Sequence, residues 1–177
     1  MEKNLVSVVI PAYNEGRNIS VIYKELVGVL KRIARNYEII FVDDGSADNT
    51  LKELKELRSS DKKVKIISFT KNFKKASALA AGLKSASGKL VVTMDADLQN
   101  NPNEIPNLLK KVDQGFDMVV GWKHPRKDPL PKIISSKIFN LLVRVLAKLK
   151  IHDCDSNFRV MKKEVIPYLE LYSGLYR

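Results

Sequence analysis

Short apolar runs alternate along the chain with longer segments in which apolar side chains recur every three or four positions. Continuous runs at residues 5–10, 37–42, 64–68 and 89–94 are typical of buried strands. After the first run, apolar residues at helical spacing predict an amphipathic helix: Ile19, Ile22, Tyr23, Leu26, Leu30 and Ile33. Further helices are expected over residues 49–59 with Asp48 or Ser46 as the cap, over 76–85, and from Pro102 to about residue 114.

This alternation of strand and helix predicts an α/β fold with a mostly parallel sheet and helices on both faces. Ligands of such sheets gather at the carboxyl ends of the strands. Three polar loops follow predicted strand ends, at residues 11–15, 43–46 and 95–99. We therefore expect the three loops to converge on one rim.

The third loop carries two carboxylates spaced two residues apart. Because residues i and i+2 of an extended segment point the same way, Asp95 and Asp97 can face one cation. Mg²⁺ and Mn²⁺ prefer oxygen ligands and often lie between carboxylates and the phosphates of a substrate. A solvated acidic turn has the same spacing, but the apolar residues between the polar ones favour a metal site.

The other two loops each allow two interpretations. Asp43 and Asp44, followed by Gly45 and Ser46, form either a plain turn with a helix cap or a pair of carboxylates that accept hydrogen bonds from a base or ribose. We favour the second interpretation. Asn14-Glu15 on its own is typical of a solvated turn.

Composition narrows the class of protein. A chain of 177 residues with 45% hydrophobic content can bury a core of domain size. The single cysteine, Cys154, forms no internal disulfide and indicates a reducing compartment. No apolar run is long enough for a membrane span, and no signal peptide is recognisable, so we expect a soluble or peripheral chain.

A net charge of +11 implies an anionic partner, which can be nucleic acid, a phosphorylated substrate or an anionic membrane. The sequence lacks the glycine-rich dinucleotide motif, the phosphate loop with Gly-Lys-Ser/Thr and the nucleophile elbow of serine hydrolases. With only His124 and His152, a histidine-rich zinc site is not expected. Nucleic acid is the weakest partner, because no aromatic platform or helix-turn-helix pattern accompanies the basic residues.

Taken together, the loop motifs resemble those of family 2 glycosyltransferases with a GT-A fold. They are Val-Val-Ile-Pro-Ala-Tyr-Asn-Glu at residues 8–15, Val-Asp-Asp-Gly-Ser at 42–46 and Met-Asp-Ala-Asp-Leu-Gln at 94–99. Within the family the chain most resembles the polyprenyl-phosphate glycosyltransferases, the group of dolichol-phosphate mannose synthase and bactoprenol glucosyltransferase. That resemblance rests on Lys-Asn-Phe at 71–73, Ala-Gly at 81–82, Gly-Trp-Lys at 121–123, Arg-Lys-Asp at 126–128, Ser-Lys-Ile-Phe-Asn at 136–140 and residues 152–159.

The resemblance implies one Rossmann-like GT-A catalytic domain over residues 1–177, with 121–177 as the acceptor side. It also implies further helices, often transmembrane, beyond Arg177, so we expect a truncated chain. The expected location is the cytoplasmic face of a membrane, peripheral or anchored through segments that this chain lacks. A homo-oligomer is compatible with this interpretation.

The resemblance assigns a role to each group of residues. The nucleotide-binding residues would be Pro11, Tyr13, Glu15, Asp43, Asp44 and Asp95. Mg²⁺ or Mn²⁺ would be held by Asp95, Asp97 and Gln99, with Asp95 lying near the ribose and sugar and Asp97 with Gln99 completing the metal site on the diphosphate. Acceptor binding would fall to Lys123, Arg126, Lys127, Ser136, Asp153 and Arg159. The catalytic set would be Asp95, Asp97, Lys123 and Arg126.

The implied reaction is an inverting transfer of a sugar from a UDP- or GDP-linked donor to a polyprenyl phosphate. A phosphate acceptor is largely dianionic at neutral pH and can attack without a protein base, whereas a hydroxyl acceptor needs one. The alternatives are a family 2 enzyme with a saccharide hydroxyl acceptor, and a nucleotide-binding fragment without transfer activity.

The basic residues after Gly121 allow two interpretations. Lys123, Arg126 and Lys127 are either solvated surface or, as we favour, cations for an anionic acceptor. Residues 131–150 form a basic amphipathic pattern, typical of a helix at an anionic membrane or of an ordinary core-packing helix, and the resemblance favours the membrane. Lys74 and Asn157 stand where relatives usually carry glycine, and because a side chain raises the cost of positive φ, less so for asparagine, the sequence leaves the loop geometry open at both positions.

Overall fold

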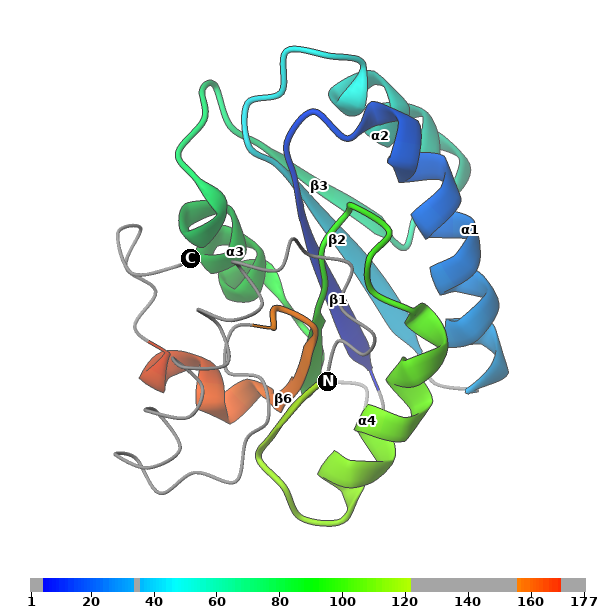
Figure 1. Ribbon diagram of the computed structural model, residues 1–177, viewed down its shortest axis with the longest axis vertical. Coiled ribbons are helices and arrows are strands. Elements are labelled where there is room, and N and C mark those ends of the chain that lie inside the picture. The colour runs from blue at the N-terminus through cyan, green and yellow to red at the C-terminus, as the bar shows by residue number, and fades with distance from the viewer. Residues whose placement is uncertain (1–4, 34–35, 122–155, 170–177) are drawn as a thin grey trace, which may run out of the picture.

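The computed structural model describes residues 5–33, 36–121 and 156–169. Within these ranges the chain forms a six-stranded sheet of order β3-β2-β1-β4-β6-β5 between helices (Figure 1). The strands are β1 (Val6–Ala12), β2 (Tyr37–Asp43), β3 (Val64–Ser68), β4 (Leu90–Thr93), β5 (Met118–Val120) and β6 (Arg159–Lys162). The helices are α1 (Gly16–Arg32), α2 (Thr50–Ser60), α3 (Lys75–Ser85) and α4 (Ile105–Asp113), with the 3₁₀ turns η1 (Pro102–Glu104) and η2 (Lys163–Tyr168).

The predicted α/β fold with a mostly parallel sheet is confirmed. Strands β1 to β4 run parallel to one another, so their carboxyl ends meet at one edge, toward the top of Figure 1. Strand β6 pairs antiparallel with both β4 and β5. The periodicity of the sequence did not predict these two short strands, which complete the sheet at the edge beyond β4.

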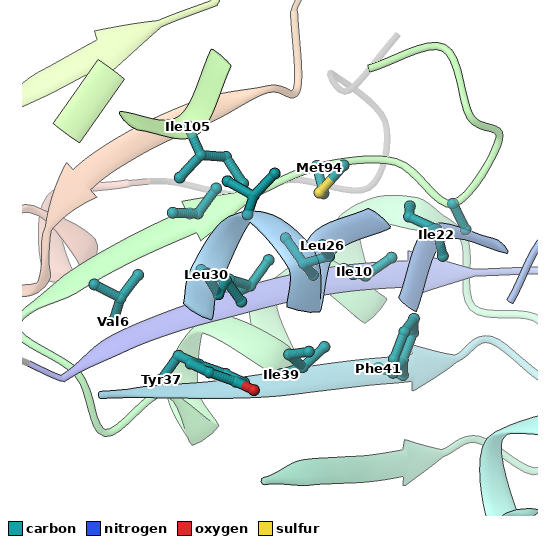
Figure 2. Close-up of a cluster of buried hydrophobic side chains, with 14 of the residues drawn as sticks. Val6, Ile10, Ile22, Leu26, Leu30, Tyr37, Ile39, Phe41, Met94 and Ile105 are labelled. Atoms are coloured by element: carbon teal, nitrogen blue, oxygen red, sulfur yellow. The ribbon is translucent and has the colours of Figure 1, made fainter. Parts of the chain in front are cut away.

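Two apolar layers enclose the sheet, one on each face. The larger layer lies between the sheet and helices α1 and α4, and contains fully buried Ile10, Leu26 and Ile105 (Figure 2). The smaller layer lies on the opposite face, where α3 and the end of η2 pack on the sheet. Because side chains alternate along a strand, β1 sends Val8 to the first layer and Val9 to the second.

Two local expectations about element boundaries were wrong. The first strand was expected over residues 5–10, but β1 continues through Pro11 to Ala12. Its pairing with β4 ends at Val9, so the last part of β1 has a partner on one side only, where proline is tolerated. Helix α2 begins after Asn49 without a side-chain cap, although Asp48 Oδ1 accepts a hydrogen bond from the Thr50 N–H at 2.9 Å.

The end of β5 and the start of β6 lie side by side in the sheet. The Gly121 N–H donates to the Phe158 carbonyl at 2.7 Å, directly beyond the pair formed by Val120 and Arg159. A Cβ added at Gly121 would lie 2.7 Å from the Phe158 ring, so only glycine allows this approach. The two ends of the segment between them are therefore joined at the sheet.

Candidate functional site

The three loops that follow β1, β2 and β4 converge on one cavity of about 370 Å³. Predicted site residues from all three loops line it, as do residues of α3 and of the segment before that helix. The lining residues are Pro11, Ala12, Tyr13, Glu15, Asp44, Asn72, Lys74, Lys75, Ala78, Asp95, Ala96 and Asp97. The expected convergence of the loops is thus present in the structure.

A larger depression, of about 500 Å³, lies along α2. The described residues that line it, among them Lys52, Lys55 and Glu56, all come from that one helix. Binding sites usually bring together polar groups from separate elements. We therefore take the cavity at the strand ends as the candidate site.

Among the described residues, the wall of this cavity carries more acid than base. Within that set, Glu15, Asp44, Asp95 and Asp97 contribute four carboxylates, and Lys74 and Lys75 contribute two ammonium groups. An anionic ligand entering alone would be repelled by this excess of negative charge. The site consequently suits a ligand that arrives with a cation or that presents hydroxyl groups to the carboxylates.

The first loop is fastened to the second by a set of short hydrogen bonds. The Asn14 N–H donates to Ser46 Oγ at 2.9 Å, and Asn14 Oδ1 accepts from the Ala47 N–H at 2.9 Å. The Glu15 N–H donates to Thr50 Oγ1 at 2.8 Å. Asn14 and Ser46 thus hold the two loops together, and Glu15 is placed at the mouth of the cavity.

Asp48 strengthens the same junction. Its Oδ2 accepts from the Gly16 N–H at 3.1 Å, and its Oδ1 accepts from both the N–H and the hydroxyl of Thr50. Burial raises the pKa of Asp48, but these hydrogen bonds outweigh burial and hold the pKa below its ordinary value. The ionised carboxylate therefore joins the start of α1 to the start of α2.

The two adjacent carboxylates after β2 differ in their surroundings. Asp43 is 1% exposed, and its oxygens accept from the Ser46 N–H at 3.1 Å and from Ser68 Oγ at 3.1 Å. Asp44 accepts through Oδ1 from the Phe73 N–H at 2.7 Å and lines the cavity. Asp44 is therefore the member of the pair that reaches the site, while the contact of Asp43 with a base stays a prediction.

Asp95 and Asp97 also lie in different surroundings. Asp95 Oδ1 forms an ion pair with Lys75 Nζ at 2.7 Å and accepts from Asn157 Nδ2 at 3.1 Å. Among the described residues, Asp97 Oδ1 accepts from the Gln99 N–H of its own turn, at 3.0 Å. Both carboxylates line the cavity, but within the described ranges only Asp95 pairs with a cation.

Residues with unfavourable positive φ angles lie around this cavity. Among the described residues, the non-glycine residues with positive φ are Asn14 at 56°, Lys74 at 75° and Leu98 at 60°. Each lies in a loop or helix start that borders the site. Asparagine tolerates this region, but lysine and leucine occupy it at a cost of about 1–3 kcal/mol each. Such strain persists where the surrounding structure requires a particular loop shape.

Lys74→Gly tests the strain at one of these positions. Lys74 has φ 75° and ψ 157°, a region that glycine occupies without steric cost. We expect the variant to gain about 1 kcal/mol of unfolding free energy, measured by urea denaturation, after the greater freedom of glycine in the unfolded chain is subtracted. Lys74→Ala removes the same ammonium but keeps the Cβ, so its free energy of unfolding should not rise above that of the wild type. Equal stabilities of the two variants would contradict the strain.

The donor set of the site fits Mg²⁺ or Mn²⁺ that is shared with a phosphorylated ligand. Among the described residues, no group of three or more His, Cys, Asp or Glu side chains could hold a metal ion by itself. Magnesium and manganese sites of substrate phosphates commonly use one or two carboxylates and complete their shell with phosphate oxygens and water. Asp97, whose Oδ2 has no hydrogen-bond partner in the described ranges, meets this requirement.

The remaining predicted residues divide into two groups. Gln99 and Arg159 are described but do not line the cavity, and Arg159 Nε donates to the Ser156 carbonyl at 2.7 Å. The others, together with the amphipathic residues 131–150, lie outside the described ranges: Lys123, Arg126, Lys127, Ser136 and Asp153.

Sequence reasoning missed Asn72 and Lys75 and noticed Lys74 only as a departure from a pattern. The sequence does contain an indication that the lysines have a role, because cations in the first turn of a helix are unfavourable next to the positive end of the helix dipole. Lys74 and Lys75 stand at the start of α3 with no acidic residue in its first turn. Such a placement indicates that the cations serve a partner outside the helix.

Comparisons with known proteins identify the family of this chain. The family model described as Glycosyl transferase family 2 matches residues 7–169. An undecaprenyl-phosphate 4-deoxy-4-formamido-L-arabinose transferase of Proteus mirabilis is 36% identical over 164 residues, covering 92% of this chain and 50% of the relative. The uncharacterized glycosyltransferase sll0501 of Synechocystis is 36% identical over 162 residues, covering 91% and 51%. The chain spans about half the length of these relatives.

Two solved structures share the fold. A mannosyltransferase of Pyrobaculum calidifontis, solved with GDP-Man and Mn²⁺, superposes with a TM-score of 0.67 at 23% identity, over 97% of this chain and 48% of that one. Glucosyl-3-phosphoglycerate synthase of Mycobacterium tuberculosis, solved with Mn²⁺, UDP and phosphoglyceric acid, superposes with a TM-score of 0.69 at 22% identity, over 92% and 57%. These structures confirm the GT-A fold.

Proposed function

The chain belongs to glycosyltransferase family 2, and from this premise we propose that it transfers a sugar from a nucleoside diphosphate to a polyprenyl phosphate. The observation that carries the proposal is the cavity at the strand ends, where loops after β1, β2 and β4 present Glu15, Asp44, Asp95 and Asp97 together. Relatives named as undecaprenyl-phosphate sugar transferases support the choice of acceptor.

The donor suits the chemistry of the cavity wall. Glu15 and Asp44 are placed to accept hydrogen bonds from ribose hydroxyls or a base, and Tyr13, 47% exposed at the rim, offers an aromatic face to the base. Asp97 would hold the metal ion, and the excess of carboxylates explains why the diphosphate would need one. Mg²⁺ or Mn²⁺ bound there would neutralise the charge that develops on the leaving diphosphate.

The acceptor determines what the protein must supply. A polyprenyl phosphate carries a second pKa of about 6 and can attack the anomeric carbon as a dianion, so no carboxylate is required as a base. The double occupation of Asp95 Oδ1 by Lys75 and Asn157 agrees with a binding role for Asp95 and argues against general-base catalysis. Lys123, Arg126, Lys127, Ser136, Asp153 and Arg159 stay our candidates for holding the acceptor.

A polyprenyl acceptor would bring the enzyme to a membrane surface. No helix in the described part of the chain is long and apolar enough to span a bilayer. We propose that contact with the cytoplasmic face is made by the basic residues 131–150, or through segments that the longer relatives possess.

A thermal-shift panel tests the donor half of the proposal. The protein is melted with UDP, GDP and CDP and with UDP-glucose and GDP-mannose, each with and without MnCl₂. Because a ligand at about 100 times its Kd adds about 2.7 kcal/mol, we expect one nucleotide class to raise the Tm by several degrees with Mn²⁺ only. If no nucleotide gives a metal-dependent shift, the proposed donor site does not exist.

The acceptor half is tested by transfer itself. The donor found in the panel is supplied in radiolabelled form with a short-chain polyprenyl phosphate, the corresponding polyprenol, and a free oligosaccharide. We expect label in the phosphate product alone, because only this acceptor attacks without losing a proton to a base. Transfer to the oligosaccharide would favour the hydroxyl-acceptor alternative, and nucleotide binding without any transfer would favour a binding fragment.

A further inference from the structure

Asp95 is held by donors from two separate parts of the fold. Lys75 Nζ, from the first turn of α3, lies 2.7 Å from Oδ1, and Asn157 Nδ2, from the segment before β6, lies 3.1 Å from the same oxygen. The Asp95 backbone N–H donates to Asn100 Oδ1 at 3.0 Å. The carboxylate is thus fixed by contacts on several sides, and Oδ2 is the oxygen that these contacts leave for a ligand.

Asn157 is itself held rigidly. It is 5% exposed, and its carbonyl oxygen accepts from Thr93 Oγ1 at 2.6 Å. Thr93 ends β4 and pairs with Arg159 of β6, so the asparagine is built into the junction of two strands. A buried amide in this position orients the carboxylate that it contacts.

Asn157, like Lys74, stands where relatives usually carry glycine, but the two substitutions affect the structure differently. Lys74 has the positive φ that glycine adopts without steric cost, whereas Asn157 does not have positive φ. Glycine at 157 would satisfy the backbone equally well but would supply no donor to Asp95. The side chain therefore adds an interaction that backbone geometry does not demand.

Lys75 has an additional electrostatic effect. An ammonium 2.7 Å from Asp95 Oδ1 neutralises that carboxylate and repels a second cation placed beside it. Asp97 has no cation against it within the described ranges, as its one contact there is with the Gln99 N–H. The two carboxylates therefore lie in surroundings suited to different ligands, which agrees with the roles that the family resemblance implies, Asp95 near the ribose and sugar and Asp97 at the metal.

We propose that Lys75 and Asn157 are positioning residues of the donor site, which reserve Asp95 for hydroxyl groups of the donor and direct the metal ion to Asp97. This inference rests on the proposed function. Asn157 fixes the direction of Oδ2, and Lys75 keeps the cation away from Asp95. Both side chains act through Asp95.

Two variants with opposite expected effects test the proposal. Asn157→Gly should weaken binding of UDP-glucose or GDP-mannose, whichever the protein binds, by about tenfold, because Oδ2 is no longer held toward the sugar. Binding of the matching UDP or GDP should stay within about twofold. Lys75→Met should weaken nucleotide-sugar binding in the same way but strengthen binding of Mn²⁺ alone by roughly threefold, because Asp95 becomes a free carboxylate. Titration calorimetry measures the nucleotides, and electron paramagnetic resonance measures free Mn²⁺.

Matched controls separate positioning from a general loss of structure. Lys84→Met removes the same charge from the exposed last turn of α3 and should change neither affinity. Lys75→Arg should restore wild-type behaviour, because it returns a cation to Asp95. Equal losses for the nucleotide and its sugar conjugate, or Mn²⁺ affinity unchanged in Lys75→Met, would overturn the proposal. Absence of metal-dependent nucleotide binding in the wild-type protein would instead overturn the proposed function.

Discussion

Replacing Asp97 with alanine is expected to abolish the Mn²⁺-dependent rise in Tm that a nucleotide produces, and to lower sugar transfer by about 100- to 1000-fold. Asp97 lines the cavity and its contact with the Gln99 N–H leaves Oδ2 for a metal ion. Without it, the diphosphate would meet the carboxylates of Glu15 and Asp44 with no bound metal ion to offset them. The measurements are thermal shift with and without MnCl₂ and initial rates of transfer.

A suitable control is Glu25→Ala. Glu25 is an exposed carboxylate on α1 that does not line the cavity, so its removal should leave both readouts unchanged. Asp97→Asn keeps the acceptor for the Gln99 N–H and loses the charge, and we expect it to fail almost as completely as alanine. A metal-dependent shift of wild-type size in either Asp97 variant would place the metal elsewhere.

The largest loss of stability is expected from Glu38→Ala, near the amino ends of the parallel strands and away from the cavity. Glu38 is 6% exposed and accepts from Ser7 Oγ at 2.6 Å and from the Ser87 N–H at 2.6 Å, and it forms an ion pair with Lys65. These contacts join β1, β2 and β3 to the turn before β4. We expect the variant to lose about 3 kcal/mol of unfolding free energy, because buried donors are left without an acceptor. Urea denaturation measures the loss.

The same carboxylate gives stability a defined dependence on pH. Burial raises the pKa of Glu38, but the hydrogen bonds from Lys65, Ser7 and Ser87 outweigh burial and leave the pKa below its ordinary value of 4.5. A lowered pKa in the folded state stabilises the protein above the pKa of the unfolded chain, and the gain is lost as the pH falls through the folded value. Glu38→Gln should therefore lie below the wild type at pH 7 and approach it in acid. A constant difference across that range would contradict the assignment.

Most of the fold could be predicted from periodicity, because each buried strand and amphipathic helix carries its own pattern. The helical spacing of Ile19, Ile22, Leu26 and Leu30 agrees with their burial against the sheet. Strands β5 and β6 could not be found in this way. Each is only a few residues long, and their pairing with one another and with β4 is a contact between distant parts of the chain. Strands that are short and that pair with distant parts of the chain leave little periodic pattern in the local sequence.

The site was predictable to the extent that it depends on topology. A parallel sheet places Glu15, Asp44 and Asp97 at one edge whatever the details of their loops. The separate environments of Asp95 and Asp97 were not predictable, since they depend on Lys75 and Asn157, which reach Asp95 from elsewhere in the chain. Spacing alone makes the two carboxylates equivalent, and tertiary contacts make them different.

The hydrogen bond between Gly121 and Phe158 defines a natural boundary for exchanging parts between relatives. A segment whose ends are already fastened side by side can change in length at little entropic cost, because closing a loop becomes only slowly more expensive as it grows. Chimeras cut at these two residues should therefore keep the described strands and the cavity intact while they take the segment between the cuts, which we propose binds the acceptor, from another glycosyltransferase. The sheet edge that holds Asn157 beside Asp95 would then receive exchanged segments of different specificity.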